Sequence, residues 1–151
     1  MSKRINKSRS YERKVSKPKE PAITPVEYGG LQAAYEHFNG ELFDGVLPNV
    51  FITYQRRAHM RGYFHAERFV GRNGEPHHHG ELALNPDAFI GRSDAEILST
   101  LVHEMVHGWQ QERGTAPKRA YHNKEWAAKM KAVGLYPSKA EWSAVARPAC
   151  R

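Results

Sequence analysis

Cysteine is almost absent from this chain, since Cys150 is the only one among 151 residues. A single thiol excludes an internal disulfide framework, a four-cysteine zinc ribbon and a CxxC redox site, and it fits a reducing compartment. Long apolar runs are missing too, because no stretch approaches the ~20 residues that a membrane helix needs. The basic amino terminus lacks the apolar core of a signal peptide. We therefore expect a cytoplasmic protein, or a nuclear one if the host has a nucleus.

The size and charge of the chain indicate one folded domain with a basic arm. Hydrophobic residues make up 40% of the 151, enough to bury a core without disulfides. The formal charge of +7 is uneven: residues 1–22 hold eight Lys or Arg and two Glu, and the other 129 residues carry a net charge of only +1. We expect residues 1–23 to form a disordered arm and residues 24–151 to form the domain.

A disordered arm of this charge suits a polyanion, because lysine and arginine contacts to phosphates release counterions. We expect nucleic acid, DNA in particular, as the partner of the arm. A solubility tail and a docking segment for another protein are the alternatives. Neither a membrane partner nor a particular oligomeric state is predicted.

The order of the expected elements, a helix, about three strands and then helices, is typical of an α+β fold. Thr24, Pro25 and Glu27 have the spacing of a capping box with proline at the first helical position, so a first helix is expected from there to about Phe43. Residues 71–80, which contain Asn-Gly and a proline, are expected to form a loop. The segments with strand patterns are residues 50–55, 62–70 and 81–85.

A second capping box, Ser93 to Glu96, opens the helix that carries the chemistry. Its apolar stripe is too wide for a surface helix, so we expect it to be central and mostly buried. A further helix is expected over residues 123–133 with Gly134 as its C-cap, and a last short helix is expected to start at Ser138.

The central helix contains an HExxH motif, formed by His103, Glu104 and His107. Residues i and i+4 lie one above the other on a helix, so both imidazoles can reach one ion at about 2.0–2.1 Å. Glu104 is rotated by about 100° from His103, so it lies beside the metal and can take a proton from a metal-activated water. A chance match would leave three ionisable groups unpaired in an apolar helix, which is costly. The motif therefore predicts a zinc site.

Catalytic zinc usually has three protein ligands, so one more is needed. Downstream, His122 and Glu125 are the candidates, and spacing alone favours His122 only modestly. The consecutive histidines 77–79 lie in the expected loop and cannot all face one ion. His37, His59 and His65 have no partner at ligand spacing.

Six segments along the chain occur together in a recognisable order: YEHFNGELFDGVLP at 35–48, GYF at 62–64, ELALNP at 81–86, STLVHEMVHGWQ at 99–110, YHNKEW at 121–126 and MKAVGLYPS at 130–138. In these segments the chain resembles the SprT-like zinc metallopeptidase domain family, which is Spartan-related. The resemblance covers residues 28–138. It implies a compact zincin-type core with an N-terminal helix, a small antiparallel or mixed sheet and C-terminal helices around the HExxH helix.

Carried over by position, the resemblance implies that His103, His107 and His122 bind zinc (Zn²⁺) and that Glu104 is the general base. It implies a zinc-dependent endopeptidase that acts on DNA-bound or DNA-crosslinked proteins, as in DNA–protein crosslink repair. Two alternatives stay open: a catalytically quiet, nucleic-acid-associated adaptor or regulator with a structural zinc, and a zinc peptidase independent of DNA. Glu104 argues against the adaptor, since a structural site has no use for a base.

Two details of substrate binding are hypotheses. An extended substrate could pair with the edge of the strand at 81–85. The side chain that stabilises the oxyanion could be Tyr121 or Tyr63, between which the sequence does not choose. Trp109 and Trp126 lie on apolar helix faces and are expected to be core residues.

Overall fold

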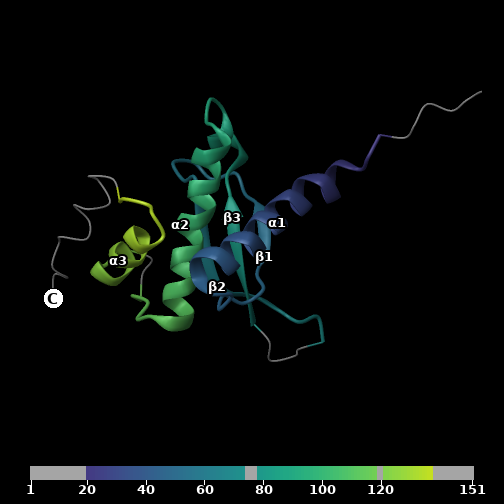
Figure 1. Ribbon diagram of the computed structural model, residues 1–151. Coiled ribbons are helices and arrows are strands. Elements are labelled where there is room, and N and C mark those ends of the chain that lie inside the picture. The colour runs from purple at the N-terminus through teal and green to yellow at the C-terminus, as the bar shows by residue number, and fades with distance from the viewer. Residues whose placement is uncertain (1–19, 74–77, 119–120, 138–151) are drawn as a thin grey trace, which may run out of the picture.

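The computed structural model describes residues 20–73, 78–118 and 121–137 (Figure 1). Its class is α+β, as predicted, with a helix, three strands and two further helices in the described part. The basic residues 1–19 and the short helix expected at Ser138 lie outside the described residues. The elements are α1 (Ile23–Phe43), β1 (Phe51–Tyr54), β2 (Gly62–Val70), β3 (His78–Leu84), the 3-10 turn η1 (Pro86–Phe89), α2 (Asp94–Arg113) and α3 (Lys124–Ala132).

The sheet is mixed and has the strand order β1-β3-β2. β1 runs parallel to β3, and β2 runs antiparallel to it, so that Ala83 pairs with Thr53 on one side and with Tyr63 on the other. Both edges of β3 are therefore occupied. The hypothesis that a substrate pairs with the edge of residues 81–85 is wrong, because that strand is the central one.

β3 begins at His78, three residues earlier than expected, so the predicted loop over residues 71–80 is too long. Phe69 pairs with His79 and Val70 with His78, beyond a register shift that follows His65. Cross-strand pairing along the nine-residue β2 overrides the local turn signal of the glycine and proline residues, because strand formation depends on the partner strand.

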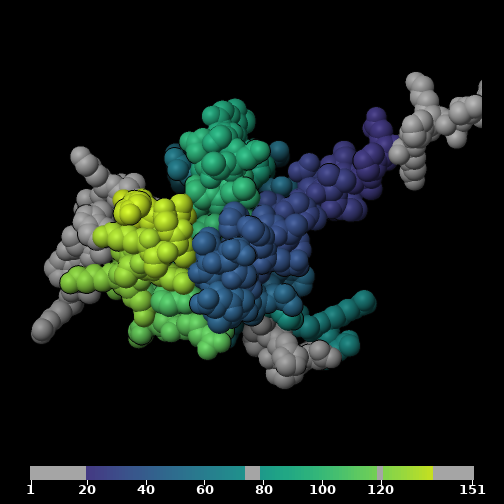
Figure 2. All heavy atoms as spheres, viewed as in Figure 1, coloured from purple at the N-terminus to yellow at the C-terminus, as the bar shows by residue number. Residues whose placement is uncertain are grey.

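One face of the sheet is covered by helices and holds the core. α1 and α2 lie against this face (Figure 1), where Leu82 and Leu84 of β3 meet Leu101 and Met105 of α2. All four side chains are at most 1% exposed, so α2 is the central helix that its wide apolar stripe predicted. The first turns of α1 extend away from this body (Figure 2), and Ile23 there is 78% exposed.

The helix ends follow the sequence signals at α2 and depart from them at α1. Ser93 and Glu96 form the predicted capping box. α1 instead begins at Ile23, with Ala22 as an N-cap that makes no side-chain bond. The capping box predicted at Thr24 is therefore wrong. Pro25 still lies within the first helical turn, where backbone N–H groups have no intrahelical partner, so its missing N–H does not oppose the earlier start.

α3 begins at Lys124, one residue later than expected, and its N-cap is Asn123, whose side chain accepts a hydrogen bond from the N–H of Trp126. Its C-cap is Val133 rather than Gly134, which follows one residue later with a φ of 82°. Glycine takes this left-handed conformation without steric cost. Gly134 therefore still marks the end of α3, but it lies one position after the C-cap and not at the C-cap itself.

Two glycines let β2 approach α2 closely. A Cβ on Gly108 would lie 3.3 Å from the ring of Phe64, and a Cβ on Gly80 would lie 3.2 Å from the same ring. The ring thus fits into a slot between β3 and the part of α2 that follows His107. The slot holds the start of β2 beside the HExxH motif. Within residues 20–73, 78–118 and 121–137, no helix has the length and apolar content to cross a membrane.

Candidate metal centre

The structure brings His103 and His107 of α2 together with His122, which lies just before α3. The ring centroids of His103 and His107 are 5.3 Å apart, and that of His122 is 5.0 Å and 5.1 Å from them. One ring nitrogen from each residue lies within 4.8 Å of the others. Ligand nitrogens around a tetrahedral zinc ion are about 3.3 Å apart, so small movements allow all three to share one ion.

The protonation state of His107 suits a metal. Burial, and after it the nearby His103 and His122, lower the pKa of His107 to about 3. An imidazole with that pKa is neutral at physiological pH and keeps a lone pair for an ion. His107 Nε2 lies 3.2 Å from His122 Nε2, so two nitrogens already point to one place. The residues present therefore fit a metal ion bound by three nitrogens.

Glu104 lies beside the three imidazoles and is 6% exposed. β2 begins against its side chain, because a Cβ placed on Gly62 would come within 3.3 Å of the Glu104 Oε1 atom and within 2.8 Å of the carbonyl oxygen of Ala83. Only glycine fits there without a shift of the strand or of the carboxylate. The start of β2 thus limits where the Glu104 carboxylate can lie.

Glu104 and the three histidines line one cleft with a volume of about 840 Å³. Residues 61–64, at the start of β2, form one wall, and α2 forms the other. Met130 of α3 and Tyr136 beyond it close a third side. A cleft of this size has room for several residues of an extended peptide.

Trp126 supports the imidazoles from behind. Its ring stacks on that of His122 with centroids 3.8 Å apart and an angle of 17° between the planes, and it also lies 5.4 Å from His107. The side chain is fully buried, as expected from its helix face. The sequence predicted that Trp126 is a core residue, but it did not predict that its ring packs against the histidine rings.

Gln110 ties the two parts of the site together. It lies on α2, three residues after His107, and is 1% exposed. Its side-chain Nε2 donates hydrogen bonds to Asn123 Oδ1 and to Glu125 Oε2, both at 2.7 Å. Because Asn123 follows His122 directly and caps α3, this amide links the helix with two ligand candidates to the segment with the third. Sequence analysis missed Gln110, although an amide within a buried stripe is a usable signal.

Glu125, the alternative to His122, lies outside the cluster. Its Oε2 accepts hydrogen bonds from Gln110 and from the backbone N–H of Thr115 at 2.8 Å, and a Cβ on Gly114 would lie 2.7 Å from the same oxygen. The carboxylate thus fills the connection between α2 and α3. The ligand role that the sequence left open for Glu125 therefore does not fit its position.

The remaining histidines of the described part do not join the cluster. His65 is exposed and its Nδ1 lies 2.6 Å from the carbonyl oxygen of Ala66. His59 lies at the rim of the cleft. His79 is exposed beside Phe51, which places it on the sheet and not in the predicted loop. His77 is outside the described residues.

The two tyrosines considered for the oxyanion differ in position. The hydroxyl of Tyr63 donates a hydrogen bond to Glu81 Oε2 at 2.9 Å. Glu81 and Tyr63 lie on the sheet face opposite Phe64, since neighbouring residues of a strand alternate between faces. The Tyr63 hydroxyl is thus directed away from the imidazoles. Tyr121 is 48% exposed next to His122 and is not among the residues that line the cleft, so the geometry selects neither tyrosine.

Comparison with known proteins adds a family match. A sequence model described as the SprT-like family matches residues 31–144, which include all three clustered histidines and Glu104. A Salmonella typhimurium protein, described as "Uncharacterized protein in mucB 3'region", is 49% identical over 49 residues. That alignment covers 32% of this chain and 66% of the relative, so the chain spans just under two thirds of the relative's length.

Proposed function

Because the chain belongs to the SprT-like family, we propose that it is a zinc-dependent endopeptidase. The observation that carries the proposal is one cleft in which three imidazole nitrogens lie within 4.8 Å of one another beside a buried glutamate. Three protein ligands with one open position are the usual arrangement of catalytic zinc, whereas structural sites are closed by four. His103, His107 and His122 are the proposed ligands.

Zinc, when bound, supplies a Lewis acid that polarises the substrate carbonyl and makes water more acidic. The residues of the chain do the rest. Glu104 accepts the proton of the attacking water and passes it to the departing amine, which is general base and then general acid catalysis. Its low exposure and the close approach of Gly62 hold the carboxylate at the cleft wall. That the core is of the zincin type remains a prediction from the family resemblance.

We place the substrate along β2, not along β3. In the described part of the sheet, β2 pairs on one side only, with β3, and residues 62–64 of this strand line the cleft. An extended peptide can add to such an edge through backbone hydrogen bonds. Backbone N-methylation of a model substrate, one residue at a time, tests this: loss of cleavage at alternate positions supports strand addition, and uniform tolerance contradicts it.

We further propose that the natural substrates are proteins bound or crosslinked to DNA. This part is supported by the family and by the net charge of +6 on residues 1–22, most of which lie outside the described residues. A basic segment next to a peptidase would concentrate it on nucleic acid, with an affinity that falls steeply with salt. Removal of residues 1–19 should then lower DNA affinity and reduce its salt dependence.

The central experiment measures metal and activity together. Wild type, Glu104→Gln and His122→Ala are analysed for zinc by mass spectrometry and then incubated with a DNA-binding protein, with and without single- and double-stranded DNA. We expect about one zinc per chain in wild type and in Glu104→Gln, and much less in His122→Ala. Of these three proteins, we expect only wild type to cleave the DNA-binding protein. Glu112→Gln, an exposed carboxylate of the same helix, is the matched control and should cleave normally.

The other outcomes identify the alternatives. Zinc without cleavage under any condition supports a quiet adaptor and contradicts the peptidase. Cleavage that is indifferent to DNA supports a peptidase that acts on free proteins. A metal-free wild type that also tolerates chelators unchanged contradicts the whole proposal.

A further inference from the structure

A second hollow adjoins the cleft. It has a volume of about 530 Å³ and is formed by the loop between β1 and β2, residues 55–61, and by the chain after β3. His59, Met60 and Arg61 line both this hollow and the cleft with the histidines. The two spaces therefore adjoin along this segment, and a chain that leaves the cleft past it reaches the hollow.

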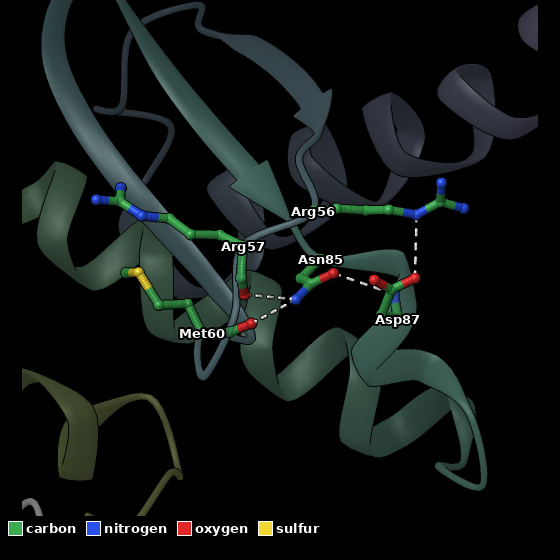
Figure 3. A network of polar contacts seen from close by, with 5 residues as sticks. All are labelled: Arg56, Arg57, Met60, Asn85 and Asp87. Atoms are coloured by element: carbon green, nitrogen blue, oxygen red, sulfur yellow. Dashed lines mark hydrogen bonds and ion pairs between the residues drawn. The ribbon is translucent and has the colours of Figure 1, made fainter.

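The loop is held by a single buried amide (Figure 3). Asn85 is 7% exposed, and its Nδ2 donates hydrogen bonds to the carbonyl oxygens of Arg57 and Met60 at 2.9 Å and 2.8 Å. The backbone N–H of Asn85 donates to the carbonyl of Arg61 at 2.8 Å. Its Oδ1 accepts from the N–H of Asp87 at 3.1 Å. Three carbonyl oxygens of the loop thus point inward, toward Asn85.

This arrangement leaves the outer surface of the loop positive. The hollow is lined by the arginines at 56, 57 and 61 and by one carboxylate, Asp87. Asp87 pairs with Arg56 at 3.0 Å. Figure 3 shows the Arg56 and Arg57 side chains leaving the loop in opposite directions. Among the described residues, neither Arg57 nor Arg61 has a carboxylate within ion-pair distance. No carboxylate ion pair in the described part of the chain thus neutralises these two guanidinium groups, of which that of Arg57 lies 5.7 Å from the centre of the Tyr63 ring.

We propose that this hollow is a subsite of the cleft that binds a carboxylate side chain of the polypeptide substrate. The inference rests on the proposed peptidase function, because that function puts an extended polypeptide in the adjoining cleft. Arg57 and Arg61 supply the charge, and Asn85 fixes the backbone from which they extend. Guanidinium groups suit carboxylates, because their planar N–H donors match the two oxygens.

Two features favour a carboxylate over a nucleic-acid phosphate. The hollow adjoins the cleft along residues 59–61, so a side chain of a polypeptide bound in the cleft is its nearest occupant. Only two arginines are available there, whereas nucleic-acid binding usually rests on a larger set of phosphate contacts. A phosphate backbone that binds the loop instead is a separate outcome of the test.

The test uses zinc-loaded full-length protein and pairs of peptides that differ only by Glu or Gln at one position. The position is moved along both sides of the cleaved bond. We expect wild type to prefer Glu over Gln by about tenfold in kcat/KM at one or two positions on one side, as expected for hydrogen bonds to a charged group. In Arg57→Gln/Arg61→Gln the ratio should fall to about one.

Arg72→Gln/Arg113→Gln is the matched control. It removes the same charge from exposed residues that line neither space, and it should keep the tenfold ratio. Equal Glu and Gln cleavage by wild type at every position overturns the proposal. So does a ratio that survives in the Arg57/Arg61 variant, or a loss of affinity for a labelled oligonucleotide in that variant with an unchanged peptide ratio.

A binding measurement distinguishes failure of the subsite from failure of the proposed peptidase function. Affinity of the same peptide pairs for Glu104→Gln protein is measured by fluorescence anisotropy. If no peptide is cleaved by wild type but Glu104→Gln binds the Glu peptide more tightly in an Arg57- and Arg61-dependent way, the peptidase fails and the subsite holds. If cleavage occurs and both peptides bind equally, the peptidase holds and the subsite is overturned.

Discussion

Two buried amides organise the two ends of the cleft, and they do so in different ways. Gln110, 1% exposed, donates to side chains and joins α2 to the segment with His122. Asn85, 7% exposed, donates to backbone carbonyls and fixes the shape of a loop. A buried amide without partners is costly, so each one strongly favours a single local arrangement.

The groups that these amides position differ as well. At the Gln110 end, burial keeps the His107 imidazole neutral, as its pKa of about 3 shows. At the Asn85 end, the arginines are exposed to water, and the Arg56 side chain is 77% exposed. A metal ligand needs a free lone pair, and burial keeps an imidazole unprotonated so that its lone pair stays free. A guanidinium group stays charged in water and can therefore act from an exposed position. The buried end of the cleft therefore suits metal binding, and the exposed end suits the binding of an anion.

The largest effect is expected from Trp126→Ala, which removes the ring behind the imidazoles. Replacing a fully buried tryptophan with alanine typically costs about 3–5 kcal/mol of unfolding free energy. Because Trp126 stacks on His122 at 3.8 Å, zinc affinity should fall too. Urea denaturation and zinc titration measure the two quantities. Trp126→Phe keeps an aromatic ring and should lose less of both; equal losses in the two variants would contradict a role for the stack.

Gln110→Ala should separate the two parts of the metal centre. Residues that orient metal ligands typically contribute about 10–100-fold to metal affinity, and we expect a loss in that range. Glu125 would keep only its bond from Thr115. Competition with a chromophoric chelator measures the affinity. Gln111→Ala, at the exposed neighbouring position, is the control and should bind zinc normally. Unchanged affinity in Gln110→Ala would contradict the link between the helices.

Asn85→Ala should act on the other end alone. The loss of the amide that donates to the carbonyls of Arg57 and Met60 should cost about 1–3 kcal/mol of unfolding free energy, with no change in zinc affinity. The Arg57 carbonyl would keep its bond from the Met60 N–H. Thermal denaturation and zinc titration of the same samples check this. Asn49→Ala, at an exposed asparagine, should leave both quantities unchanged. A fall in zinc affinity in Asn85→Ala would show that the two ends are not independent.

The smallest effect is expected from pH in the metal-free protein. Folding lowers the pKa of His107 from 6.5 to about 3, so the unfolded chain binds this proton first as the pH falls. The stabilisation by neutral His107 is present above pH 6.5 and is lost as the pH falls toward 3. Between pH 7.5 and 6.5 this group should lower the unfolding free energy by about 0.4 kcal/mol. Urea denaturation at several pH values should give a shallower dependence for His107→Gln; the same slope in both proteins would contradict the assignment.

The sequence predicted much of this fold because several of its signals are local. The capping box at Ser93, the wide stripe of α2 and the bounds of β2 are all confirmed. One failure occurs where a distant segment decides: β3 starts at His78 because β2 offers a partner. The start of α1 also departs from the capping signal at Thr24, in a part of the helix that extends away from the body.

By itself, the sequence determined that His103, Glu104 and His107 share one helix and that both imidazoles lie on one face of it. Helix geometry fixes these relations over four residues, without reference to any other part of the chain. Only the tertiary structure decided that His122 lies beside them while Glu125 binds Gln110 and Thr115. It also decided that Asn85 shapes an arginine loop next to the cleft. Those contacts join residues far apart in the chain, and the cost of leaving a buried polar group unpaired selects among them only once the elements have packed.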